Sequence, residues 1–395
     1  MKKILFVIES LDVAGAEKSL VTLLSLLDYD KFSVDLMLFS HGNKLERFIP
    51  QKVNVLPPLC YTEFSNSSIK ESIKYSIKNK NINMLTSRVK FSTKIRLKKY
   101  SNPEKARIYW QTVSNLIESN QGEYDIAISY SQGVPTFYVA EKVRAKKKFA
   151  WVNVSYHLNQ REKNFQQKYY QEFNNIIAVS NSTKDVFNKT FPQFKNKLEV
   201  IYDINHPELI KNMANLEYGY EDNFKGLRIL TIGRLARQKG YDIALEACEK
   251  LKNNGIDFKW YVLGKGPLKE EIEREIIKRN LSNNFILLGV KSNPYPYIKA
   301  SDLYVQTSKY EGFGLALAEA RMLNVPVVTT RFDAVYNQMI DDENGVVVSM
   351  DGESVYKGIK RYLEEPLLKE RVISFLKTEK KGNCEEVYKF YELIN

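Results

Sequence analysis

The chain has 395 residues, of which 44% are hydrophobic and 27% charged, with 18 Gly and 12 Pro. This length exceeds one ordinary domain and fits two of about 200 residues, and the composition excludes disordered and collagenous proteins. The net charge of +12 is concentrated in residues 68–110, where twelve Lys and Arg outnumber two Glu. The rest is close to neutral, which excludes a nucleic-acid-binding surface over the whole protein.

Short apolar runs alternate with helical patterns through the first half. Residues 4–8 form an apolar run that is closed by Glu9. This run is shorter than a signal-peptide core, so we expect a buried first strand. A helix pattern covers residues 17–27. Further strand patterns follow at residues 34–39, 125–129, 149–154 and 176–179. Apolar strands separated by helices predict a parallel sheet covered on both faces.

The basic segment 68–110 interleaves lysines with apolar side chains. Its lysines include Lys70, Lys74, Lys78, Lys94, Lys98 and Lys99. A basic amphipathic stretch suits an anionic membrane surface. The alternative is an ordinary solvated helical insertion. No nucleic-acid-binding motif accompanies the charge, so we expect no nucleic-acid partner. No stretch approaches the length of apolar sequence that spans a bilayer, so membrane contact is expected to be peripheral.

The alternation lapses in a polar stretch near residues 203–225 and resumes at residues 227–232. The second half repeats the strand and helix theme, with strand patterns at residues 260–263, 285–288, 303–306, 325–329 and 346–348. We therefore predict a first domain over residues 1–205, a linker over 206–226 and a second domain over 227–380. The last segment, 381–395, is predicted to be a helix that crosses back onto the first domain.

The three cysteines are Cys60, Cys248 and Cys384. They are far apart, odd in number and outside any C-x-x-C motif, so neither a disulfide framework nor a zinc cluster is indicated. This usage is typical of a reducing compartment, and we expect a cytoplasmic protein.

Four features of the second half come where a predicted strand ends and a helix begins. The first is the segment 233–240, in which Gly233 allows a tight exit from the strand and Arg234 and Lys239 bring two cations to one phosphate cluster. Taken alone, it also fits a solvated basic turn. The second and third, a G-x-G turn at residues 264–266 and the end of the strand at 285–289, are weaker and fit plain turn chemistry.

The fourth feature is the segment 308–320. Gly312 and Gly314 let the backbone approach a ligand closely, and Glu311 and Glu319 are eight residues apart. Eight residues are about 2.2 helical turns, so from the glycine loop onward we expect both carboxylates to face the same cleft. Anionic ligands of open α/β sheets bind at the carboxyl ends of the strands, beside helix N-termini.

Together these residues resemble the retaining glycosyltransferase family 4, which has the GT-B fold. The most specific part of the resemblance is the pair Glu311 and Glu319 with Phe313, Gly314 and Leu315 between them. A looser match is the turn Gly15-Ala16-Glu17 after the first strand. The resemblance implies an α/β protein of two Rossmann-like domains facing each other across a cleft.

The resemblance also implies roles for single residues. The positions of Arg234 and Lys239 hold the donor diphosphate, next to Gly233. The position of Glu319 binds the donor ribose. The sugar hydroxyls are surrounded by the carboxylate of Glu311 and the backbone of residues 312–315, that is Gly312, Phe313, Gly314 and Leu315. The main chain near Val290 contacts the nucleobase, and Gly15 lets a first-domain loop close on the phosphates. Fixed cations and helix N-termini stabilise the leaving diphosphate without a metal ion or other cofactor, and no Asp-x-Asp motif is present.

One position departs from the family pattern. Similar proteins carry a histidine after a middle strand of the first domain, where this chain has Trp151-Val152-Asn153. An asparagine forms hydrogen bonds but does not exchange a proton at neutral pH, so a role of Asn153 in catalysis would be positional. The nearest histidine, His157, is the candidate replacement.

The leading hypothesis is therefore a hexosyltransferase that uses a nucleoside diphosphate sugar, with a UDP-sugar favoured. Its acceptor is expected to be a saccharide or lipid-linked saccharide, in surface or capsular polysaccharide assembly. One alternative is a non-catalytic transferase-like subunit, which Asn153 motivates. Another is a sugar-nucleotide epimerase of the same architecture. A nicotinamide-dependent oxidoreductase is disfavoured because no G-x-G-x-x-G follows the first strand.

Overall fold

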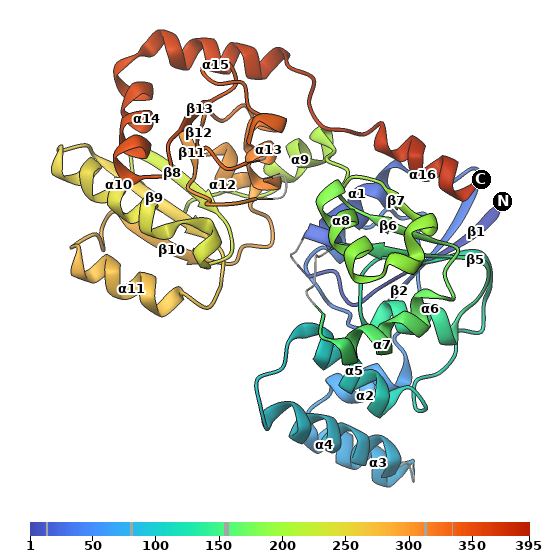
Figure 1. Cartoon of the computed structure of the whole chain (residues 1–395). Helices are drawn as coiled ribbons and strands as arrows, with labels where there is room; N and C mark the ends of the chain where they lie inside the picture. Colours follow the sequence, from blue (N-terminus) through green and yellow to red (C-terminus); the bar gives the residue numbers. More distant parts are fainter. Residues whose placement is uncertain (13–14, 80–81, 154–157, 312–313, 334) are drawn as a thin grey trace. The chain divides into compact units, whose positions relative to one another are not determined.

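The computed structural model describes residues 1–12, 15–79, 82–153, 158–311, 314–333 and 335–395. They form two compact units (Figure 1). The first unit comprises residues 1–204 together with 384–395, and the second comprises residues 205–383. Each unit has its own parallel sheet and its own apolar core.

The sheet of the first unit has seven strands in the order β3-β2-β1-β4-β5-β6-β7. The strands are β1 (Lys2–Ile8), β2 (Phe32–Leu38), β3 (Asn54–Val55), β4 (Glu123–Ser129), β5 (Arg144–Val152), β6 (Asn175–Ala178) and β7 (Leu198–Val200). The five inner strands confirm the predicted strand patterns. The sequence did not predict β3 and β7, because these edge strands are only two and three residues long.

The helices of the first unit are α1 (Gly15–Leu26), α2 (Cys60–Asn66), α3 (Ile69–Lys78), α4 (Ile82–Arg96), α5 (Asn102–Val113), α6 (Val134–Lys142), α7 (Gln160–Tyr170), α8 (Asn181–Thr190) and α16 (Glu386–Ile394). The basic segment contains α3, α4 and most of α5. Figure 1 shows α3 and α4 side by side, and both contact α2. Among the described residues, no helix is both long enough and apolar enough to cross a bilayer.

Helix α16 returns to the first unit, as the sequence predicted. The ring of Phe390 stacks on Phe6 of β1 with centroids 6.0 Å apart. The hydroxyl of Tyr391 donates to the carbonyl of Leu26 at 3.0 Å and accepts from the backbone N–H of Asp28 at 3.0 Å. These contacts anchor the C-terminal helix beside β1 and the end of α1.

The sheet of the second unit has six parallel strands in the order β10-β9-β8-β11-β12-β13. The strands are β8 (Leu227–Ile232), β9 (Phe258–Leu263), β10 (Phe285–Gly289), β11 (Leu303–Gln306), β12 (Val327–Thr330) and β13 (Val346–Val348). All six patterns predicted from the sequence are strands. The order reverses between β8 and β11, which pair with Leu303 opposite Ile229.

The helices of the second unit are α9 (Pro207–Ala214), α10 (Tyr241–Asn253), α11 (Lys269–Lys278), α12 (Tyr295–Lys299), α13 (Leu315–Met322), α14 (Gly352–Glu364) and α15 (Pro366–Thr378). Helix α9 lies in segment 206–226, where the sequence analysis expected a linker. Pro207 begins this helix, and the ring nitrogen Nδ1 of His206 accepts from the backbone N–H of Leu209 at 3.2 Å. A cap and an N-terminal proline compensate for a weak periodicity, so the first part of this segment is helical, and the whole segment belongs to the second unit.

Candidate functional site at the carboxyl ends of β8 and β11

The turns after β8 and β11 lie at the point where the strand order of the second sheet reverses. In open α/β sheets such a reversal opens a crevice at the carboxyl ends of the two strands, and ligands bind there. The turn after β8 is residues 233–240, and the loop after β11 begins at Thr307. These are the first and fourth features of the sequence analysis.

Lys239 and Glu311 join the two turns. The ammonium group of Lys239 forms an ion pair with Oε1 of Glu311, whose side chain is only 9% exposed. The same oxygen accepts from the hydroxyl of Ser308 at 2.6 Å. Ser308 is fully buried, two residues after the end of β11. A carboxylate in such surroundings needs both partners, because burying an unpaired charge is costly.

The backbones of the two turns are also joined. The hydroxyl of Thr307 donates to the carbonyl of Lys239 at 2.9 Å, and the N–H of Lys309 donates to the carbonyl of Gln238 at 2.8 Å. The side-chain amide of Gln238 donates to the carbonyl of Tyr310 at 2.9 Å. The two turns therefore converge on one place in the second unit.

Gly240 makes this close approach sterically feasible. It has a left-handed backbone with φ of 62°, and it ends the turn directly before α10. A Cβ at this position would collide with the carbonyl oxygen of Thr307. Only glycine combines this φ with this contact without strain. The N-terminus of α10 consequently lies beside the turn after β11.

Glu319 lies one turn inside α13 and is 5% exposed. Its Oε1 accepts from the hydroxyl of Tyr295 at 2.9 Å. The negative charges of Glu311 and Glu319 both influence the pKa of the Tyr304 hydroxyl. Burial is the main cause that raises the pKa of the Tyr304 hydroxyl well above its ordinary value, and both carboxylates add to the effect. Both carboxylates thus influence the same buried hydroxyl of β11.

Glu311 itself precedes the helix. Helix α13 begins at Leu315, and Gly314 is its N-cap with φ of 85°. The helical spacing therefore applies only to the stretch that leads to Glu319, and the loop accounts for the position of Glu311. Gly312 and Phe313, both expected to contact the sugar, lie outside the described residues.

Two donors of this site have no partner among the described residues. Arg234 is exposed in the turn after β8. The side chain of Gln306, at the end of β11, is 2% exposed, and its Nε2 lacks a hydrogen-bond acceptor. A buried donor without an acceptor costs about 1–3 kcal/mol, which a ligand oxygen would recover. Sequence reasoning missed Gln306 and Tyr295. The sequence did contain a signal for Gln306, because this polar residue ends an otherwise apolar strand.

The other two expected contacts of the second unit lie at neighbouring strand ends. Gly233 directly follows β8. A Cβ added to this glycine would lie 3.1 Å from side-chain carbons of Lys239, so the lysine stem packs closely against it. Val290 directly follows β10 and is 40% exposed. Strand β9 lies between β8 and β10, and Gly264 at its end donates to the carbonyl of Gly289 at 2.8 Å.

The expected residues of the first unit lie at the carboxyl ends of β1 and β5. Gly15 begins α1 and is exposed, with open space around the position of a Cβ. The side-chain amide of Asn153 donates to the carbonyl of Tyr130 at 2.6 Å. Its buried Oδ1 has no partner in the part of the chain that is described. His157 lies outside the described residues.

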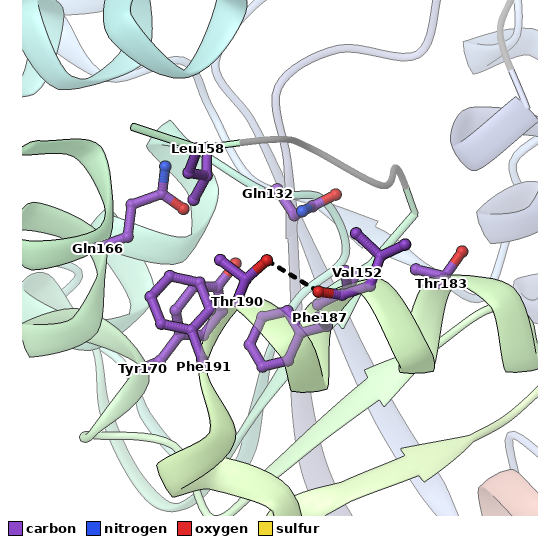
Figure 2. Close-up of a pocket in the computed structure, with 10 residues that line it drawn as sticks. Gln132, Val152, Leu158, Gln166, Tyr170, Thr183, Phe187, Thr190 and Phe191 are labelled. Atoms are coloured by element: carbon purple, nitrogen blue, oxygen red, sulfur yellow. Dashed lines mark hydrogen bonds between the residues drawn. The ribbon is translucent and has the colours of Figure 1, made fainter. Parts of the chain in front are cut away.

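A hollow in the first unit is too small to hold a sugar. Figure 2 shows Tyr170, Phe187 and Phe191 lining it together with Gln132 and Thr190. Its volume is about 10 Å³, which is room for about one water molecule. A larger hollow of about 360 Å³ lies in the second unit beside α10 and α11, and its lining includes Arg237 and Lys309 from the two joined turns.

Comparison with known families finds a match within the second unit. Residues 221–378 match the family described as "Glycosyl transferases group 1". This range includes both turns of the candidate site.

Curated relatives are named as glycosyltransferases. An uncharacterized glycosyltransferase of Methanocaldococcus jannaschii is 32% identical over 41% of this chain and 41% of its own length. The N-acetylgalactosamine-N,N'-diacetylbacillosaminyl-diphospho-undecaprenol 4-alpha-N-acetylgalactosaminyltransferase of Campylobacter jejuni is 30% identical over 54% of this chain and 57% of its own length. The chain thus spans about half the length of these relatives.

Solved structures of similar fold cover the whole chain. TarM of Staphylococcus aureus, solved with UDP among its ligands, has a TM-score of 0.64 at 16% identity, with complete coverage of both chains. Anabaena HepE, solved with UDP and glucose, has a TM-score of 0.62 at 16% identity over 100% of this chain and 99% of its own. The fold is therefore the predicted GT-B fold of two Rossmann-like domains.

Proposed function

We propose that this chain is a retaining glycosyltransferase of family 4 that moves a hexosyl unit from a nucleoside diphosphate sugar to a saccharide or lipid-linked saccharide. A UDP-sugar is the favoured donor. The observation that carries the proposal is the ion pair between Lys239 and Glu311, which joins two turns at the strand-order reversal of the second sheet. The named relatives and the matched family support the reaction class.

The chemistry of the site suits a leaving diphosphate. Transfer of the sugar leaves a nucleoside diphosphate with growing negative charge, and preorganised cations and N–H dipoles stabilise such a charge. Arg234 and Lys239 supply cations, and the N-termini of α10 and α13 supply backbone N–H groups. These groups would make the transfer independent of a metal ion. Undiminished transfer after treatment with a chelator is the expected result, and recovery only on adding Mg²⁺ or Mn²⁺ would contradict it.

The two carboxylates have separate proposed tasks. Glu319 is buried against Tyr295 and accepts hydrogen bonds from the donor ribose. Glu311, held by Lys239 and Ser308, lies at the start of the loop that surrounds the sugar hydroxyls. The unpartnered Nε2 of Gln306 is an additional donor for a sugar or phosphate oxygen. Val290, at the end of the strand beside β9, contacts the nucleobase.

A thermal-shift series tests the donor assignment. The full chain is melted with UDP, GDP, ADP and the corresponding sugars, because a ligand that binds only the folded state raises the melting temperature. We expect UDP and at least one UDP-sugar to raise the melting temperature. We also expect the chain to hydrolyse that UDP-sugar slowly. The anomeric configuration of the product, read by NMR, tests retention. A product with inverted configuration would overturn the retaining assignment.

The cellular role proposed here is surface or capsular polysaccharide assembly at the cytoplasmic face of a membrane. The Campylobacter jejuni relative is named for a diphospho-undecaprenol substrate, which supports a lipid-linked acceptor. Transfer to a short saccharide on an undecaprenyl diphosphate carrier, compared with the same saccharide without the lipid, tests the acceptor class.

A second candidate function is a non-catalytic transferase-like subunit. It is favoured by Asn153, which occupies the position of the family's histidine and whose amide is held by the carbonyl of Tyr130. No donor hydrolysis with any common nucleotide sugar, together with intact nucleotide binding, would favour this candidate. Measurable hydrolysis that Lys239→Ala removes would exclude it.

A further inference from the structure

Helix α3 exposes its apolar side chains and buries its serines. Ser72 and Ser76 are buried, whereas Ile69, Ile73 and Ile77 are 66%, 41% and 74% exposed. The three isoleucines are spaced four residues apart and share one face of the helix. A surface helix of a globular protein ordinarily does the opposite.

Hydrogen bonds on the serine face hold α3 in this orientation. The hydroxyl of Ser72 donates to the carbonyl of Phe64 at 3.0 Å, and Arg88 of α4 donates to Ser72 and, at 2.7 Å, to the carbonyl of Ser67. Ser68 caps the helix through a reciprocal bond with Glu71. The isoleucines therefore remain exposed while hydrogen bonds on the serine face hold the helix.

The neighbouring helix α4, which contacts α3, also exposes apolar side chains. Ile82 and Val89 of α4 are 67% and 53% exposed, and Leu97 after the helix is 82% exposed. Exposed cations accompany these apolar residues: Lys70, Lys74, Lys78, Lys90, Lys94, Arg96, Lys98 and Lys99. We call these fourteen residues the α3–α4 patch. Glu71 is the single acidic residue in the described residues between 69 and 99.

We propose that the α3–α4 patch docks this protein on an anionic lipid bilayer. A helix with a lysine face beside an isoleucine face lies in the plane of the membrane interface, where the branched side chains enter the acyl boundary and the ammonium groups meet lipid phosphates. The positive charge of the patch is complementary to an anionic surface. A second copy of the chain would bring cations against cations. A nucleic acid offers no environment for six exposed aliphatic side chains.

Vesicle binding of the full-length chain tests the proposal. Flotation is measured with vesicles of phosphatidylcholine alone and with vesicles that also contain about one third phosphatidylglycerol. We expect binding to the anionic vesicles to be roughly tenfold or more stronger, and to weaken as salt screens the charges. Equal binding to both vesicles, or none to either, would overturn the proposal. In the second case, an acidic protein partner becomes the better occupant.

Two sets of variants separate the charge from the apolar contribution. The charge variant is Lys70→Gln, Lys74→Gln and Lys78→Gln, and its control replaces Lys147, Lys189 and Lys195, exposed lysines elsewhere in the first unit, with Gln. The same change of net charge should weaken binding roughly tenfold in the first variant and little in the control. Equal weakening in both would show attraction by net charge alone and contradict the patch.

The apolar variant is Ile69→Ser, Ile73→Ser and Ile77→Ser. Its control carries Ile277→Ser, Leu363→Ser and Leu367→Ser, at side chains that are 68%, 42% and 80% exposed on helices of the second unit. Binding should fall severalfold in the variant and remain unchanged in the control, with circular dichroism confirming that both fold. Unchanged binding in the isoleucine variant would overturn insertion. The assay contains no donor or acceptor, so its result is independent of the proposed transferase activity.

Discussion

The ammonium group of Lys239 is paired with the carboxylate of Glu311, although the two residues are 72 positions apart in the sequence. They meet because β8 and β11 are neighbours in the sheet and both turns follow the carboxyl ends of these strands. The lysine side chain is 19% exposed, and the proposed function assigns it to the oxygens of the donor diphosphate.

Lys239→Ala should lower the transfer rate by roughly a hundredfold or more, because the proposed function assigns this fixed cation to the leaving diphosphate. Initial rates with saturating donor and acceptor measure the effect. Lys278→Ala, at a lysine whose side chain is 75% exposed on α11, is the matched control and should leave the rate unchanged. A variant at Lys239 with wild-type kinetics would refute the assignment of this residue.

Glu319→Gln should weaken the binding of UDP with little effect on the fold. The amide retains the shape and can accept from the hydroxyl of Tyr295, but it lacks the charge that the proposed function assigns to binding the two ribose hydroxyls. Titration calorimetry with UDP and with UMP measures the loss of affinity. Tyr295→Phe is the companion variant, since it removes this hydrogen bond while keeping the charge of Glu319. Equal affinity for UDP in Glu319→Gln and the wild type would remove Glu319 from the ribose site.

Gly240→Ala should destabilise the second unit more than Gly255→Ala does. Both glycines have positive φ, of 62° and 70°, but only at Gly240 does an added Cβ meet the carbonyl of Thr307. The backbone strain alone costs about 1 kcal/mol, and the contact adds to it at Gly240 only. Hydrogen exchange of peptides from β8 and β11 measures the opening free energy. Equal losses in the two variants would mean that the turns are not held together at Gly240.

The stability of the first unit should fall as the pH rises from about 4.5 to about 7. Burial raises the pKa of Glu17 from its ordinary value of 4.5 to about 7, and the nearby carboxylates of Asp12 and Glu9 add to this shift. Between these two values the folded chain binds a proton that the unfolded chain has released. Ionisation of Glu17 therefore costs up to about 3 kcal/mol, and the full cost applies above pH 7.

Glu17→Gln isolates this effect. The variant should melt at a higher temperature than the wild type at pH 8 and at the same temperature at pH 4. Glu123→Gln, at an exposed carboxylate at the start of β4, is the control and should change neither value. A melting-temperature difference for Glu17→Gln that is the same at both pH values would contradict the pKa shift.

The sequence was sufficient for the elements that local periodicity encodes. The apolar runs at β8, β11 and β13 were predicted within their observed bounds, and the glycine turns after the strands marked the candidate site. Edge strands β3 and β7 were missed because two or three residues carry too little pattern to be recognised. Helix α9 was missed because its cap, His206, lies in a polar stretch without a clear period.

Contacts between distant residues were decided by the tertiary structure. The sequence predicted the basic amphipathic character of residues 68–110, but packing against α2 decided that Ser72 faces inward and Ile73 outward. In the same way, the sequence identified Glu311 and Glu319 as a pair, while strand order brought Lys239 and Tyr295 to them as partners. Periodicity is a property of neighbouring residues, whereas burial and pairing depend on which elements the sheet places side by side.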